Sequence, residues 1–188
     1  MSVPDVLGEV SDRLVQGLMF HNEQASLNRL LGFYGFAAMH EYQYLSDSIC
    51  MRRVNDWCVD HCGMIPQQGR QSASSVLDKW RGRDRDGIDR DMRRRALIES
   101  FEEYVAWERG TLSLYQRACD SFVRGGESFA YHLIETLVCE VGEELAEVRR
   151  MWTELSATDW DMAYVMEQQR QLESDYRKLT AKIGKELQ

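Results

Sequence analysis

Proline is almost absent from this chain. Its 188 residues include two prolines, Pro4 and Pro66, and none follows Pro66. Because proline interrupts helices and is common in the turns between strands, so long a stretch without it favours long helices over a turn-rich β fold. The length suits one domain, since domains commonly have about 100–200 residues. We therefore expect an all-α protein.

Five segments carry apolar residues three and four positions apart, the spacing of one face of a helix. The predicted helices run from about Pro4 to Leu31, from Ala37 to Gly63, from Asp89 to Val123, from Glu127 to Leu155, and from Thr158 nearly to Gln188. A short helical turn is expected over residues 75–80, inside a long loop. Two tightly joined helices, a long crossover and two more tightly joined helices make a four-helix bundle. We expect one domain overall, with the bundle in residues 1–157 and a long C-terminal helix, a possible oligomerisation element, in residues 158–188.

Composition and charge exclude several classes of protein. The chain has 23 Lys and Arg against 31 Asp and Glu, a net charge of −8, which argues against a dedicated nucleic-acid binder. Seven arginines and four aspartates alternate over residues 81–95, a pattern typical of a solvated, self-paired stretch. Five cysteines lack the paired spacing of a secreted disulfide framework, and no apolar run is long enough to span a membrane. We expect a cytoplasmic protein without a membrane partner.

Acidic and polar side chains interrupt the apolar stripes near the middle of each bundle helix. Glu108 lies between Val105 and Leu112, and an unpaired buried charge costs several kcal/mol, so it needs a partner or a metal. The other candidates are Glu140 and Glu144 on the fourth helix, His40 and Asp47 on the second, and His21 and Asn28 on the first. The alternative for each glutamate is a boundary position, where the stem packs and the head reaches water. His40 and Asp47 could equally form a satisfied polar pair.

Four short motifs resemble ferritins. They are the segment Asn22–Asn28, Glu108 on the third helix, the Glu140-x-x-Glu143 pattern on the fourth, and the end of the second helix at His61-Cys62-Gly63. The resemblance implies a ferritin-like four-helix bundle with one long crossover, and a two-iron site that oxidises ferrous ion. Asn28 stands where the family has a glutamate and Glu143 where it has histidine, and the second helix lacks a Glu-x-x-His motif. The resemblance therefore implies a di-metal centre that has been lost or remodelled.

Two functions follow from these residues. The first is a metal-handling protein that binds iron or manganese in the bundle core, with ferroxidase-type activity if the site is intact. Its predicted metal ligands are Glu108, Glu140, Glu144, His40 and Asp47. The second is a metal-free binding or scaffold protein, in which the same residues form a hydrogen-bonded network that fixes helix register. The sequence names no small-molecule ligand.

The last predicted helix carries a narrow apolar seam. Its members are Val165, Gln169, Leu172, Tyr176, Leu179 and Ile183. Such a seam suits one partner helix, which predicts a homo-dimer or another small oligomer made through this helix rather than a closed ferritin cage. The alternative is that the helix folds back along its own bundle.

Overall fold

The computed structural model describes residues 2–63, 75–80 and 85–186. These residues contain five long helices, one short helix, one 3₁₀ turn and no strand. They are α1 (Val3–Leu31), α2 (Tyr34–Cys62), α3 (Ser75–Trp80), η1 (Arg85–Gly87), α4 (Arg90–Gly125), α5 (Ser128–Ala157) and α6 (Met162–Glu186). None of the helices in this part of the chain is long and apolar enough to cross a membrane. The predicted loop over residues 64–74 and the arginines at 81 and 83 lie outside the described residues.

Local signals set the ends of the long helices. Ser2 and Asp5 form a capping box, in which each side chain accepts a hydrogen bond from the other residue's backbone amide. Gly32 caps the end of α1 and Gly126 caps the end of α4, and their φ angles of 87° and 74° lie in the left-handed region. Glycine enters this region without the steric penalty of a side chain, so it closes a helix cleanly. The predicted all-α architecture is confirmed.

The start of α6 differs from the prediction. The side chain of Asp161, not Thr158, accepts hydrogen bonds of 3.0 Å from two backbone amides of the first turn. Thr158 instead ends α5, with its hydroxyl donating to a carbonyl of that helix. Between them Trp160 has a φ of 55°, and its ring packs edge-on against Phe101 and Trp152. Burial of this ring moves the helix start three residues along the chain.

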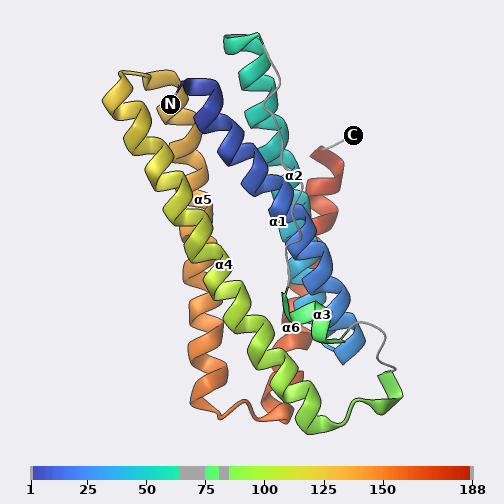
Figure 1. Ribbon diagram of the computed structural model, residues 1–188. Coiled ribbons are helices and arrows are strands. Elements are labelled where there is room, and N and C mark those ends of the chain that lie inside the picture. The colour runs from blue at the N-terminus through green and yellow to red at the C-terminus, as the bar shows by residue number, and fades with distance from the viewer. Residues whose placement is uncertain (1, 64–74, 81–84, 187–188) are drawn as a thin grey trace.

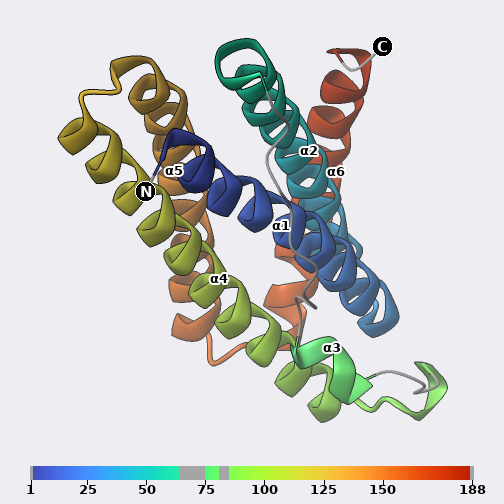
Figure 2. The ribbon, with the colours of Figure 1, turned by 45° about the horizontal axis from the view of Figure 1, so that its top comes forward.

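The helices form two hairpins with an additional helix beside them. Figure 1 shows α1 beside α2, and α4 beside α5. α1 also packs against α4, and this contact joins the two hairpins. The short helix α3, in the crossover, lies against both α1 and α4. α6 runs along α2, as the view in Figure 2 makes clear.

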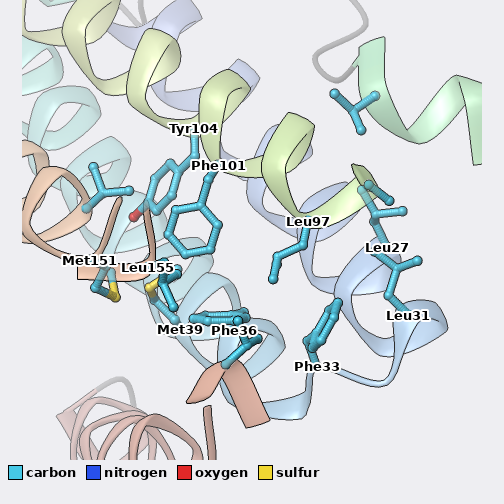
Figure 3. Close-up of a cluster of buried hydrophobic side chains, with 14 of the residues drawn as sticks. Leu27, Leu31, Phe33, Phe36, Met39, Leu97, Phe101, Tyr104, Met151 and Leu155 are labelled. Atoms are coloured by element: carbon cyan, nitrogen blue, oxygen red, sulfur yellow. The ribbon is translucent and has the colours of Figure 1, made fainter. Parts of the chain in front are cut away.

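Two separate apolar cores lie along the bundle. The first includes Phe20, Leu27, Leu31, Phe33, Phe36, Met39, Leu97, Phe101, Tyr104, Leu145, Met151 and Leu155. Figure 3 shows part of this core. The second includes Val6, Leu7, Val10, Leu14, Cys50, Val54, Tyr115, Phe122, Ile134, Leu137 and Val141. All four bundle helices contribute to both cores, so each helix leaves one core and enters the other near its middle.

α6 uses its apolar seam within the chain. Gln169 and Tyr176 are only 3% and 5% exposed. The Gln169 side chain accepts a 2.9 Å hydrogen bond from the backbone amide of Gly35 on α2, and the Tyr176 ring lies 5.5 Å from that of Tyr42. The fold-back alternative is therefore the observed arrangement for this part of the seam. Leu179, further along, is 42% exposed.

Candidate metal centre

A layer of polar side chains separates the two apolar cores. α1 leaves the second core after Leu14 and enters the first at Phe20, and α5 passes from one to the other between Val141 and Leu145. The polar layer consists of His21 from α1, His40 and Asp47 from α2, Glu108 from α4 and Glu144 from α5. Each of the four bundle helices thus contributes at least one polar side chain to the layer.

Glu108 is the most deeply buried carboxylate of the layer. It is 2% exposed, and its Oε1 has no hydrogen-bond partner among the described residues. Nε2 of His21 lies 3.7 Å from Oε1, too far for a hydrogen bond. Burial raises the pKa of Glu108, and the carboxylate of Asp47 raises it further, while the Arg13 guanidinium opposes both. A buried oxygen without a partner is costly and needs an explanation.

Asp47 approaches the same histidine from α2. Its Oδ2 lies 3.8 Å from Nε2 of His21, and burial raises its pKa to about 8 although its side chain keeps 23% exposure. Space for this carboxylate exists because residue 17 on α1 is glycine. A methyl group at Gly17 would overlap Oδ2 of Asp47. The close approach of Asp47 to α1 therefore depends on the missing side chain.

His21 and His40 face each other from neighbouring helices. Their Nδ1 atoms are 3.0 Å apart, and both residues are almost completely buried. Burial lowers the pKa of His40 to about 3 and that of His21 well below its ordinary value. Both rings are therefore neutral near pH 7. The ring of Tyr104 packs against both, with its centroid 4.6 Å from that of His40.

Arg13 supplies positive charge at the edge of the layer. Its guanidinium lies 3.3 Å above the ring of Trp107, in cation–π geometry. Nε donates to Oγ1 of Thr111 and a terminal nitrogen donates to the Trp107 carbonyl, each at 2.8 Å. The charge lowers the pKa of Glu108, yet none of these hydrogen bonds reaches a carboxylate.

Glu144 connects the layer to an open cavity. Burial raises its pKa, and the nearby Glu108 carboxylate raises it further. The cavity has a volume of about 550 Å³ and lies between α2, α5 and α6. Its acidic lining residues are Glu140, Glu143, Glu144, Glu147 and Asp175. Glu140 is held toward α2, since one carboxylate oxygen is 3.0 Å from Arg53 and the other accepts from the Cys50 thiol at 3.3 Å.

The structure brings some of the predicted ligands together. Asp47 and Glu108 meet around His21, and Glu108 lies close enough to Glu144 to raise its pKa. His40 stands behind His21, and Glu140 lines the cavity. The α1 residue that faces Glu108 is His21, which the sequence marked only as an interruption of the stripe.

Asn28, which the resemblance aligned with a ferritin ligand, instead donates to the carbonyl of Gln24 one helical turn earlier. Arg13 was missed altogether by sequence reasoning, because nothing in its spacing distinguishes it from a solvated arginine.

The donor set of the layer fits a metal chemically, but it is not assembled around one. Carboxylate oxygens and imidazole nitrogens are common ligands of iron, and the unpaired Oε1 of Glu108 is free to accept a cation. Within the described residues, no group of three or more His, Cys, Asp or Glu side chains lies close enough together to hold a metal ion as it stands. Metal binding therefore requires movement of these side chains.

Solved structures with a similar backbone identify the fold, whereas sequence comparisons find no relative. No family model matches the sequence, and no curated protein matches it. A humanized archaeal ferritin has a similar structure, with a TM-score of 0.76 over 92% of this chain and 97% of its own, at 15% identity. The ferritin-like fold is therefore established. An Archaeoglobus fulgidus ferritin engineered to a closed form gives a TM-score of 0.68 at 14% identity, covering 92% of this chain and 96% of its own. An open-pore ferritin from the same archaeon gives 0.68 at 12%, covering 91% and 94%.

The ferritin-like fold confirms the predicted class and the order of the helices. At identities of 12–15% the similarity is one of fold, so the roles of individual residues rest on the polar layer itself. Nothing in these comparisons points to manganese. The predicted ferritin-like helical bundle is confirmed.

Proposed function

We propose that the polar layer of this ferritin-like protein binds iron, through Glu108, Asp47 and His21, with Glu144 as a further donor. The observation that carries the proposal is the buried carboxylate of Glu108, whose Oε1 is unpaired and faces Nε2 of His21. The ferritin-like fold supports iron as the first cation to test.

The electrostatics of the layer favour a bound cation. Burial raises the pKa of Asp47, Glu108 and Glu144, and neighbouring carboxylates raise the pKa of Glu108 and Glu144 further. Without a cation the layer must hold extra protons. A divalent cation attracts all three carboxylates at once and releases those protons.

In this proposal the two remaining predicted ligands, Glu140 and His40, do not bind the metal directly. Glu140 lines the acidic cavity that also reaches Glu144, so it attracts cations to the entrance of the layer. His40 contacts His21 and supports it from behind. Ferrous ion held by these residues would be the substrate of oxidation to ferric ion with dioxygen or peroxide as the electron acceptor, the activity that the resemblance to ferritins implies.

A second candidate is a metal-free scaffold, and a specific network favours it. Gln24 on α1 accepts a 2.6 Å hydrogen bond from Ser100 and donates a 2.7 Å bond to Glu103, both on α4. The other oxygen of Glu103 accepts from the amide of Val76 in α3. This network fixes helix register without a metal, and Arg13 already lowers the cost of the buried carboxylates.

Equilibrium dialysis against Fe(II) without oxygen, with iron measured by mass spectrometry, separates the two candidates. Glu108→Gln keeps the shape of the side chain and removes its charge, and Glu102→Gln alters an exposed glutamate on the same helix as a control. We expect the affinity to fall by at least about tenfold for Glu108→Gln and to stay unchanged for Glu102→Gln. If the unaltered protein takes up no iron, the scaffold is the better description. If both variants bind iron equally, Glu108 is not a ligand and the proposed site is refuted.

A further inference from the structure

Two buried histidines of the polar layer contact each other through the same ring atom. Nδ1 of His21 on α1 lies 3.0 Å from Nδ1 of His40 on α2, and the two residues are 2% and 1% exposed. A hydrogen bond between two such nitrogens requires a proton on one and a lone pair on the other. The two rings therefore cannot protonate Nδ1 at the same time.

Neutral imidazole has one N–H, so the two histidines adopt opposite tautomers. Both rings are almost completely buried, which disfavours the charged imidazolium form, so each ring carries a single N–H. In one arrangement the shared proton belongs to His40, and His21 carries its own proton on Nε2. In the other, the shared proton belongs to His21, and Nε2 of His21 is a bare lone pair.

The second nitrogen of His21 is the one that faces the carboxylates. Its Nε2 lies 3.7 Å from Oε1 of Glu108 and 3.8 Å from Oδ2 of Asp47. A cation between these groups can bind Nε2 only when this nitrogen has no proton. Cation binding therefore selects the arrangement in which Nδ1 of His21 donates to His40.

We infer that His40 is a positioning residue for the cation site: by accepting a hydrogen bond from His21 Nδ1, it presents His21 Nε2 as a ligand. The inference rests on the proposed function. His40 is itself held in place, because the rings of Tyr104 and Phe20 pack against it at centroid distances of 4.6 and 6.3 Å. A partner on the far nitrogen fixes both the tautomer and the orientation of a ligating histidine.

Nuclear magnetic resonance of protein labelled with ¹⁵N in histidine tests the tautomers directly. The chain has four histidines, and the exposed His61 and His132 serve as internal references. With Zn²⁺ added as a diamagnetic probe, we expect the proton of His21 on Nδ1 and that of His40 on Nε2. A proton on His21 Nε2 in the presence of Zn²⁺, or no binding of Zn²⁺, would overturn the inference.

Two substitutions of His40 provide the matched test by Fe(II) dialysis. His40→Asn places a carbonyl oxygen near the position of Nδ1 and keeps the acceptor, whereas His40→Phe keeps the packing against Tyr104 and loses it. We expect an affinity about 10–100-fold lower for His40→Phe, and within a few-fold of the unaltered protein for His40→Asn. Circular dichroism of both variants checks that the helices persist.

The failures of the two ideas are distinguishable. If the unaltered protein binds no iron, the proposed function fails and the inference fails with it. If iron binds and Glu108→Gln weakens it, but His40→Phe binds as tightly as the unaltered protein, only the role of His40 is refuted. Equal losses for His40→Asn and His40→Phe would also refute it, because a loss of packing alone would then explain both.

Discussion

Replacing Gly17 by alanine should weaken cation binding with little effect on stability. The added methyl group overlaps Oδ2 of Asp47, which is the free end of a side chain and can rotate away. Forcing the side chain from its preferred rotamer costs about 0.5–1.5 kcal/mol. Alanine in place of glycine inside a helix stabilises by about 0.5–1 kcal/mol. The two effects nearly cancel, so the free energy of unfolding should change by less than about 1 kcal/mol.

A matched control isolates the displacement of Asp47. Gly142 on α5 has no atom within 4 Å of an added methyl group, so Gly142→Ala should show the helical gain alone. Urea unfolding followed by circular dichroism measures both variants. The difference between Gly142→Ala and Gly17→Ala should be about 0.5–1.5 kcal/mol, the rotamer cost of Asp47.

Iron binding supplies the decisive comparison for the same pair. We expect Gly17→Ala to lose at least about tenfold in Fe(II) affinity, or about 1.4 kcal/mol, because a proposed ligand is turned away from His21. Gly142→Ala should bind as the unaltered protein does. Equal affinities for the two variants would show that the position of Asp47 beside α1 has no part in cation binding.

Three further predictions address the docking of α6 and the ionisation of the layer. Gly35→Ala places a methyl group against the backbone of Gln169, which cannot move aside, so urea unfolding should show a loss of about 1–3 kcal/mol; an unchanged midpoint would contradict this docking. The metal-free protein should lose stability as the pH rises from about 6.5 to 8, because Asp47 has a pKa of about 8 in the folded state against an ordinary value of 3.8, and Asp47→Asn should flatten this slope. The window starts at pH 6.5 because, at lower pH, the lowered pKa values of the buried histidines make stability rise with pH and oppose the effect of Asp47. A rise in stability between pH 6.5 and 8 would refute the prediction. A chain stopped after Ala157 should unfold more easily than the full chain, since it uncovers the face of α2; light scattering that shows a stable, smaller oligomer would instead support assembly through α6.

Local sequence signals were sufficient for most helix boundaries. Pro4 and Asp5 at the start of α1, and Gly32 and Gly126 at helix ends, act through the conformation of neighbouring backbone atoms. The start of α6 was mispredicted because it depends on Trp160, whose ring is buried between α4 and α5. Both Thr158 and Asp161 are residue types that cap helices, and the burial of the Trp160 ring, which decides between them, is a tertiary contact.

The seam of α6 shows what periodicity leaves undecided. An alternation of four and three describes a face that suits one partner helix, and the same face can pack on another copy or on the same chain. The tertiary structure decides through Gly35, where the absence of a side chain lets the backbone of α6 approach α2 closely. Complementary shape at a distant position, not the pattern itself, selects the partner.

For the polar layer too, the sequence indicates part of the arrangement and the tertiary structure decides the rest. Sequence alone predicted that each bundle helix carries a polar residue on its apolar stripe near its middle, because the hydrophobic period identifies the face that packs inward. Which of these residues meet depends on the rotation and register of four helices, and those are set by packing in the two apolar cores. Only the tertiary structure therefore placed His21, rather than Asn28, opposite Glu108, and set His40 behind it.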